Sequence, residues 1–283
     1  MQVIPKNQLE SFGRQFQGDF SGIRVGVECT MMGRGTLPPI FKVWTDNLTH
    51  PSVVVMTLDP QHAPPLHRFI AHIWTAKGVT FERFKSLIEQ VPIDWNKPML
   101  FQQNQYPETF DLLSQLTESK PGRVREKMAT CKQYVAPENI AQSKVWELPD
   151  GLTWDHLRPE EAELINSTWD HAYGEDSVRR IRFYLEHLPN SCIRTTGGEC
   201  VASCLCTDWG TVGLLYVSPS WRRHGLGQLV LSDCAAKLAR LDLGFPVYCQ
   251  IVLNNEPSFK LISDKLNWTN SHCDIVFAWY DVS

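Results

Sequence analysis

The chain has 283 residues, of which 43% are hydrophobic and 20% are charged, and its formal net charge at pH 7 is -4. This composition is typical of a folded globular protein, and it argues against a disordered or fibrous chain. The small negative charge provides no basic field of the kind that binds phosphate backbones, so nucleic acid is not expected as a partner.

No stretch approaches the roughly twenty apolar residues that cross a bilayer, and the first residues lack the apolar run of a secretory signal. We therefore expect an intracellular protein with no membrane partner. Glu10 and Asp19 near the start are unlike the acid-poor leader of a mitochondrial protein, which favours the cytoplasm over the mitochondrion.

Nine cysteines occur without a CxxC pair, and their odd number argues against a complete disulfide framework. Cys200, Cys204 and Cys206 share strand parity and could face one metal ion. Buried free thiols on an apolar strand face explain them more simply. We therefore predict no metal.

The N-terminal half combines runs typical of strands with an amphipathic helical pattern. Strands are expected at residues 22–30, 53–58 and 98–102, and the helical spacing is carried by Phe81, Phe84, Leu87 and Ile88. These elements indicate an α/β domain over residues 1–130. The following segment is polar and basic and contains Pro121 and Pro137, so a linker is placed at residues 131–144.

The C-terminal domain, residues 145–283, is expected to mix strands and helices. The strands are predicted at residues 152–157, 191–194, 200–206, 212–217, 245–252 and 275–280. The helices are predicted at residues 159–169, 176–188, 225–241 and 256–266. Only a mixed α/β class accommodates this order.

The segment from Leu214 to Gly227 carries the clearest chemical signal. A strand leads into a basic loop with Gly225 and Gly227, and an amphipathic helix follows. Backbone N–H groups at such a helix start lack intrahelical partners, and the helix dipole points at the same place, so a pyrophosphate is readily held there. Taken alone, this pattern also fits a plain strand-to-helix turn. A dinucleotide fingerprint would require a third glycine where Val230 stands, and the Gly-Lys-Ser/Thr of a P-loop is absent.

The pattern Val217-x-Pro219-x-x-Arg222-Arg223-x-Gly225-x-Gly227 resembles motif A of the GNAT N-acyltransferase superfamily, in its FR47-like form. The resemblance implies a GNAT fold of class α/β (α+β), with a mixed, mostly antiparallel sheet flanked by helices. It also implies that acyl-CoA is the co-substrate.

Further segments resemble one branch of that superfamily, the glycine N-acyltransferase-like proteins. They are residues 93–97 (Ile-Asp-Trp-Asn-Lys), 169–174, 188–192 (Leu-Pro-Asn-Ser-Cys) and 243–248 (Leu-Gly-Phe-Pro-Val-Tyr), with Asn255-Glu256. By this resemblance the N-terminal domain is a second, degenerate GNAT-like unit that shapes the acceptor site.

The resemblance implies which residues contact coenzyme A. The strand ending at Val217 would pair with the pantetheine amides, and the loop and first helical turn would surround the pyrophosphate. The implied contacts are Leu215, Val217, Arg222, Arg223, His224, Gly225, Leu226, Gly227, Gln228, Asn255 and Ser258. For Asn255 a helix N-cap, and for Ser258 a solvated first-turn position, are equally good interpretations.

The catalytic residues are harder to assign. The position at which the glycine-conjugating relatives have a glutamate is Thr211 here, and a hydroxyl can only relay a proton through water. Glu199, Asp208, His224 and His272 are conceivable substitutes, but each is expected in a solvated turn, loop or strand end. Many GNAT enzymes protonate the leaving thiolate with a tyrosine, whereas residues 261–263 read Leu-Ile-Ser. Thr211 and Glu199 remain as candidates.

The leading hypothesis is an N-acyltransferase that moves an acyl group from acyl-CoA to the amine of a small acceptor, such as glycine or another amino acid. One alternative is a catalytically weak or inactive CoA-binding module, which is favoured by Thr211 at the glutamate position of the relatives. Another is a protein or peptide N-acetyltransferase, which would require an open acidic groove. The acyl group, the acceptor and the oligomeric state are left open.

Overall fold

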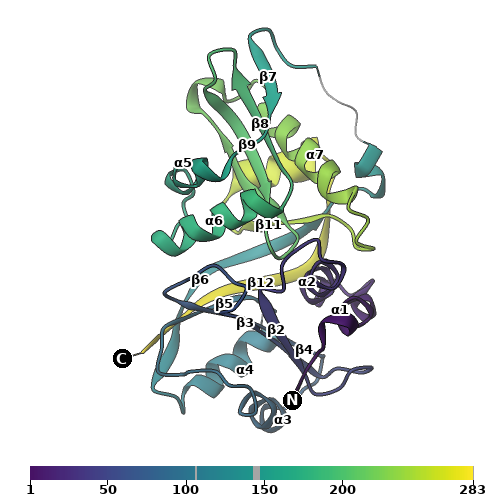
Figure 1. The fold of residues 1–283 in the computed structure, drawn as a ribbon, viewed down its shortest axis with the longest axis vertical. Helices are drawn as coiled ribbons and strands as arrows, with labels where there is room; N and C mark the ends of the chain where they lie inside the picture. The colour runs from purple at the N-terminus through teal and green to yellow at the C-terminus, as the bar shows by residue number, and fades with distance from the viewer. Residues whose placement is uncertain (106, 143–146, 283) are drawn as a thin grey trace. The chain divides into compact units, whose positions relative to one another are not determined.

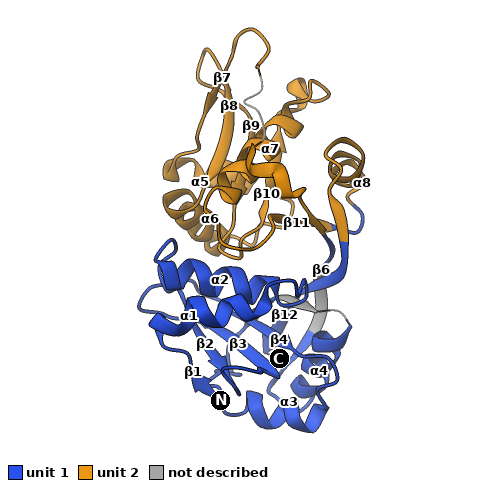
Figure 2. Cartoon of the chain, turned by 90° about the vertical axis from the view of Figure 1, so that its right-hand side faces the viewer, with its two compact units in different colours: residues 1–133, 252–254, 271–283 blue, residues 134–251, 255–270 orange. Residues whose placement is uncertain are grey.

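The computed structural model describes residues 1–105, 107–142 and 147–282, and it contains two compact units. Unit 1 consists of residues 1–133, 252–254 and 271–283, and unit 2 consists of residues 134–251 and 255–270 (Figures 1 and 2). Among the described residues, no helix is long and apolar enough to cross a membrane.

The elements of the first half follow the order strand, two helices, three strands, helix, strand, helix, strand. They are β1 (Gln2–Val3), α1 (Lys6–Gly13), α2 (Ile23–Arg34), β2 (Phe41–Thr45), β3 (Val53–Leu58), β4 (Phe69–Thr75), α3 (Phe81–Ile88), β5 (Met99–Gln105), α4 (Glu108–Thr117) and β6 (Gly122–Val135), with a 3-10 turn at Arg14–Phe16. Strands β2, β3 and β4 are antiparallel neighbours, whereas β4 and β5 run parallel.

The second half repeats this order. Its elements are β7 (Leu152–Asp155), α5 (Ala162–Ser167), α6 (Glu175–His187), β8 (Asn190–Thr195), β9 (Cys200–Cys206), β10 (Val212–Val217), α7 (Leu226–Ala239), β11 (Tyr248–Val252), α8 (Glu256–Phe259) and β12 (Thr269–Val282). Short turns lie at Glu138–Gln142, Pro159–Glu161 and Pro219–Trp221, and a π-helix at Lys260–Lys265 continues α8. The chain is therefore an internal repeat of one α/β arrangement.

The strands form two mostly antiparallel sheets. The smaller sheet, in unit 2, has the order β10-β9-β8-β7, and α7 packs against β8, β9 and β10. The larger sheet has the order β1-β2-β3-β4-β5-β12-β6-β11, so the last strand of the second repeat occupies the place beside β5. The apolar runs at residues 53–58, 200–206 and 212–217 correctly predict β3, β9 and β10.

The strand expected at residues 22–30 is wrong, because this segment is the helix α2. The alternation of Ile23, Val25 and Val27 resembles a strand, but polar and apolar side chains of α2 are buried alike. Arg24 and Glu28 are both buried, and the Arg24 Nε donates to Glu28 Oε1 at 3.1 Å. This pairing at the i, i+4 spacing is a helical signal that the strand interpretation overlooked.

The segment expected as a linker at residues 131–144 begins inside β6, which ends at Val135. Ala129, Cys131 and Gln133 are buried, while the residues between them are only half-buried. This alternation is the period of two of a β-strand, which the polar composition of the segment conceals. Residues 143–146 lie outside the described part of the chain. The last strand, expected in the C-terminal domain, groups mainly with unit 1 because Ile275 to Tyr280 pair with β5.

Candidate functional site: an open strand edge and an uncapped helix start

Strand β10 leaves its regular pairing partway along its length. It pairs with β9 through Val212↔Cys206, but the register shifts between Gly213 and Tyr216, and Leu214 has a φ of 47°. Just before β10 begins, Thr211 forms an isolated parallel bridge with Tyr248 of β11, and beyond this bridge β10 and β11 belong to different sheets. A bulge that redirects the strand beside such an opening leaves backbone groups available for an extended ligand.

The loop after β10 ends at a helix start that its own side chains do not cap. Arg223 and Gly225 have φ values of 66° and 79°, and Gly225, the N-cap residue of α7, makes no side-chain cap hydrogen bond. The first N–H groups of an α-helix have no intrahelical acceptor, and the helix dipole adds positive potential beside them. The start of α7 is therefore built to receive an anion.

The corresponding helix of the first repeat is built differently. At the start of α3 the Thr80 hydroxyl accepts a hydrogen bond from the backbone N–H of Arg83 at 3.3 Å, so this helix caps itself. Its two flanking strands also stay together, since β4 and β5 form a parallel ladder from Phe69↔Met99 to Ala71↔Phe101. Of the two repeats, the second therefore has the open strands and the uncapped helix.

The open strand and the uncapped helix border one pocket of about 1050 Å³, all of whose lining residues belong to unit 2. This volume lies at the upper end of the range for small-molecule sites. The pocket is lined by Ser167, Thr168, Asp170, Leu215, Tyr216, Val217, Trp221, Arg222, Arg223, Gly225, Leu226, Gly227, Gln228, Asn255, Pro257, Ser258, Leu261 and Lys265.

Nearly all the residues that the motif implied as coenzyme A contacts line this pocket. They are Leu215, Val217, Arg222, Arg223, Gly225, Leu226, Gly227, Gln228, Asn255 and Ser258. His224 is the exception, because its exposed ring packs against Trp221 and its Nδ1 lies 3.0 Å from the Arg222 carbonyl oxygen. Asn255 also caps α8, since its Oδ1 accepts from the Ser258 N–H at 3.1 Å.

The two catalytic candidates from the sequence do not line the pocket. Thr211 is only 4% exposed, and its hydroxyl lies 2.9 Å from that of Thr207. Glu199 is exposed in the turn between β8 and β9. Their part in catalysis therefore stays a prediction.

Asp208, expected in a solvated loop, is instead 1% exposed and accepts two hydrogen bonds from Arg180 Nη2, at 2.8 and 2.6 Å. Burial opposes the charge of Arg180, but the Asp208 carboxylate outweighs it and raises the pKa of Arg180 well above its usual range. Trp209 and Tyr184 flank the guanidinium. This buried pair ties α6 to the turn that leads into β10 and thereby positions the strand.

Several pocket residues escaped the sequence analysis. Ser167, Thr168 and Asp170 come from the end of α5 and the turn after it, and Leu261 and Lys265 come from the π-helix. They lie 45 or more residues before, or 30 or more residues after, the motif, so no local spacing marks them. The insertion of a π-helix after α8 is itself a frequent feature of functional sites.

The charges around the pocket favour an anionic ligand. Arg222, Arg223 and Lys265 are exposed cations of the lining, and Asp170 is the one carboxylate among the lining residues that the structure describes. Arg222 is held in place because its Nε donates to the Val217 carbonyl oxygen at 3.2 Å. The described residues contain no group of three or more His, Cys, Asp or Glu side chains that could hold a metal ion.

Comparisons with known proteins show what the chain is similar to. Residues 192–274 match the model of the FR47-like protein family. Human glycine N-acyltransferase is 30% identical over 118 residues, which are 42% of this chain and 38% of that protein. The bovine glycine N-acyltransferase is 26% identical over 131 residues, which are 46% of this chain and 42% of that protein. The matched regions thus span less than half the length of these relatives.

Solved structures show the same fold over the whole chain. A Drosophila protein from a structural genomics programme has a TM-score of 0.80 at 17% identity, covering 100% of this chain and 98% of that one. A tandem GNAT protein from the clavulanic acid biosynthesis pathway has a TM-score of 0.52 at 12% identity, with coverage of 99% and 97%. A GCN5-related N-acetyltransferase from Kribbella flavida has a TM-score of 0.53 at 15% identity, with coverage of 89% and 94%.

The expected fold class and the expected resemblance are both confirmed. The chain therefore shares its fold with solved GNAT structures, its residues 192–274 match the FR47-like family, and it is similar over 118 residues to glycine N-acyltransferase.

Proposed function

We propose that unit 2 binds acyl-CoA and transfers its acyl group to the amine of a small acceptor, such as glycine or another amino acid. The observation that carries this proposal is the uncapped start of α7 beside the opened strand β10, within a single cation-lined pocket. The chain's similarity to glycine N-acyltransferase supports the reaction class, and the acceptor is part of the proposal.

The residues present fit coenzyme A. Its pyrophosphate would accept hydrogen bonds from the N–H groups of the first turn of α7, with Arg222 and Arg223 beside it. Its pantetheine amides would pair with the backbone of β10 near Leu215, as a peptide pairs with an open strand edge.

The acceptor must lose a proton before its nitrogen can attack the thioester. An amine with a pKa of about 10 costs roughly 4 kcal/mol to deprotonate at pH 7. Asp170 is suited to hold the ammonium group and to take its proton, directly or through a water molecule, because it is the carboxylate of the described lining.

The phenol of Tyr216, which also lines the pocket, can donate a hydrogen bond to the departing sulfur. A thiol pKa of about 8.5 makes the thiolate a fair leaving group even without such a donor. We therefore expect loss of the Tyr216 hydroxyl to slow the reaction less than loss of the Asp170 carboxylate.

A second candidate, a CoA-binding module without transferase activity, is favoured by one observation. Thr211 occupies the glutamate position of the relatives by sequence, and neither it nor Glu199 lines the pocket. This candidate predicts normal binding of coenzyme A with no release of thiol that depends on an amine.

The deciding assay supplies the full-length chain with acetyl-, benzoyl-, phenylacetyl- and long-chain acyl-CoA and with pooled amino acids, and follows free thiol against a control without amine. Amine-dependent release supports the transferase. If calorimetry detects CoA binding and no mixture releases thiol above the control, the binding module replaces it.

Three matched variants locate the base. We expect Asp170→Asn to lower the turnover of the acceptor by about a hundredfold, within the usual range for a general base, without weakening CoA binding. Glu199→Gln and Thr211→Val should keep turnover close to that of the parent, since both side chains lie outside the pocket lining. The opposite ranking would show that Asp170 is not the base.

A further inference from the structure

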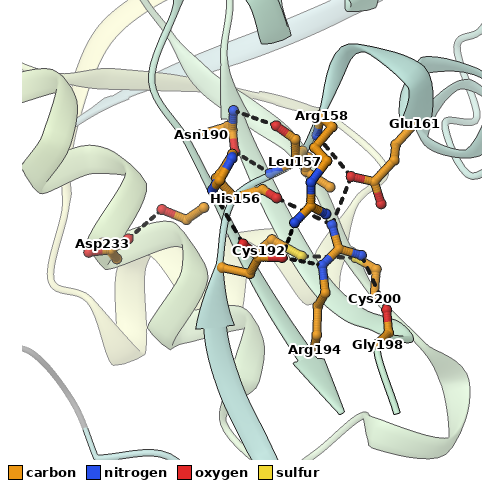
Figure 3. Close-up of polar contacts among 12 residues, drawn as sticks. His156, Leu157, Arg158, Glu161, Asn190, Cys192, Arg194, Gly198, Cys200 and Asp233 are labelled. Carbon is orange, nitrogen blue, oxygen red and sulfur yellow. Dashed lines mark hydrogen bonds and ion pairs between the residues drawn. The ribbon is translucent and has the colours of Figure 1, made fainter. Parts of the chain in front are cut away.

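Two cysteines lie side by side on neighbouring strands of unit 2. The Sγ atoms of Cys192 on β8 and Cys200 on β9 are 3.3 Å apart, beside the Arg194 side chain (Figure 3). Cys192 faces Ser203 and Cys200 faces Arg194 in the strand register. A shift in that register next to Arg194 brings the two thiols together diagonally across the strand pair.

Little movement would join these sulfur atoms. A disulfide bond is about 2 Å long, so the two Sγ atoms would have to approach by roughly 1 Å. Rotations about the Cα–Cβ bonds of two small side chains can supply a shift of this size. Both cysteines are free thiols in the structure.

The two thiols differ in exposure and in charge environment. Cys192 is 0% exposed, whereas Cys200 is partly open to solvent. The Cys192 thiol donates a hydrogen bond to the sulfur of Cys200, and this bond, together with the Arg194 charge, lowers the pKa of Cys200 against the opposing effects of burial and of the Glu161 carboxylate. The same hydrogen bond and burial raise the pKa of Cys192. The thiol of the more exposed residue therefore also forms a thiolate more readily.

The favourable charge is fixed in place. Arg194 is held by Asp155, with Nε to Oδ2 at 2.6 Å, and by Glu161, with Nη2 to Oε2 at 2.7 Å (Figure 3). Its Nη2 also donates to the His156 carbonyl oxygen at 3.2 Å. Because Asp155, Glu161 and the His156 carbonyl oxygen all bind the Arg194 side chain, its guanidinium is held next to the two thiols.

We propose that Cys200 and Cys192 form a peroxide-sensitive thiol pair that closes to a reversible disulfide. The Cys200 thiolate attacks one oxygen of hydrogen peroxide, so that an S–O bond forms, the O–O bond breaks and hydroxide leaves. The Cys192 sulfur then attacks the Cys200 sulfenic acid, so that the S–S bond forms and the S–O bond breaks. The second hydroxide takes the Cys192 proton, and the sum is two thiols and one peroxide giving one disulfide and two waters. A thiol reductant of the glutathione class restores the pair.

The chain contains its own control pair. Cys206 on β9 and Cys234 on α7 have Sγ atoms 3.6 Å apart, but both are 0% exposed. Their separation is similar to that of Cys192 and Cys200, whereas peroxide has no access to them. Proximity alone would oxidise both pairs, and proximity with access would oxidise only Cys192 and Cys200.

The experiment maps the cysteines of the reduced full-length chain after brief exposure to a small excess of hydrogen peroxide, followed by alkylation of the remaining thiols. Trypsin cuts after Arg194, so Cys192 lies on the fragment 183–194 and Cys200 on the fragment 195–222. We expect these two fragments to be joined, and fragmentation to place the bond at Cys200. Dithiothreitol should separate them again.

Variants test the order of the two steps without requiring the disulfide. In Cys192→Ser, Cys200 should accumulate as a sulfenic acid that a dimedone probe captures. In Cys200→Ser, Cys192 should stay reduced, and Cys206→Ser should form the disulfide as the parent does. The proposal is overturned if residues 192 and 200 stay reduced while other thiols oxidise, or if Cys206 and Cys234 link at the same rate.

Discussion

Gly225 should be more sensitive to substitution than Gly227, although the two belong to the same motif. Gly225 has a φ of 79°, a conformation that costs an L-residue about 1–2 kcal/mol. A Cβ added there meets no protein atom within 4 Å, and since Gly225 lines the pocket, the methyl group would occupy space meant for the ligand. Loss of one charge-assisted hydrogen bond to phosphate is worth about 1.5–3 kcal/mol, or at least about tenfold in affinity.

Gly227 lies within α7 and has no left-handed backbone. A Cβ there would lie 3.4 Å from Val217 Cγ2 and 3.8 Å from Leu261 Cδ2, which are ordinary contacts. Alanine is also favoured over glycine inside a helix by about 1 kcal/mol. We therefore expect Gly227→Ala to keep or raise the thermal midpoint, and to weaken CoA binding less than Gly225→Ala does.

The assay compares both alanine variants with the parent by thermal unfolding and by CoA calorimetry. Gly225→Ala should lower the unfolding midpoint by a few degrees, since about 1 kcal/mol shifts a domain of this size by roughly 2–4 °C. It should also lower CoA affinity at least about tenfold. If Gly225→Ala keeps both properties while Gly227→Ala loses CoA, the start of α7 is not the phosphate site.

Three further predictions concern charge. Lys265→Gln should weaken CoA binding and reduce its dependence on salt, whereas Lys260→Gln, on the same π-helix but outside the pocket lining, should change neither in calorimetric salt titrations. Asp208→Ala should destabilise the protein by about 3–5 kcal/mol in urea unfolding, because it leaves the buried Arg180 charge unpaired. A backbone N–H and a guanidinium lower the pKa of Asp155 to about 2, below its unfolded value of 3.8, so its stabilising effect is present above pH 4 and is lost as the pH falls through 2. Asp155→Asn should therefore have a lower urea midpoint than the parent at pH 7, and this difference should disappear as the pH falls below 2.

The sequence predicts best where local pattern and tertiary role coincide. Strand β9 is bounded by turns and is buried on both faces, and a continuous apolar run marks it without help from the rest of the chain. The helix α2 is mispredicted as a strand, because its buried Arg24 and Glu28 give a core segment an alternating polar and apolar sequence. The place of β12 could not be predicted, since its apolar residues fit either sheet and only pairing with the distant β5 decides.

The binding site shows the same division. The glycine-containing loop can be recognised in the sequence as a candidate phosphate site, because such a site needs backbone conformations that only a few residue types allow. The other wall of the pocket needs only side chains of suitable size and charge, which no spacing marks. Only the folded structure therefore shows that Asp170 and Lys265 line the same pocket as the residues of β10. Catalytic side chains are the hardest part, because neither Thr211 nor Glu199 is among the lining residues of the pocket and their part in catalysis stays a prediction.

The internal repeat shows why one half of this fold is suited to bind an anionic ligand while the other half is not. Both repeats place a helix directly after their fourth strand, and both helix starts have N–H groups to satisfy. In the first repeat Thr80 satisfies one from within the chain, and the neighbouring strands close into a ladder. In the second repeat Gly225 offers no side chain, and the strands part after a single bridge. A helix start that satisfies itself gains stability and loses its affinity for anions, so the two repeats represent opposite uses of the same unpaired N–H groups.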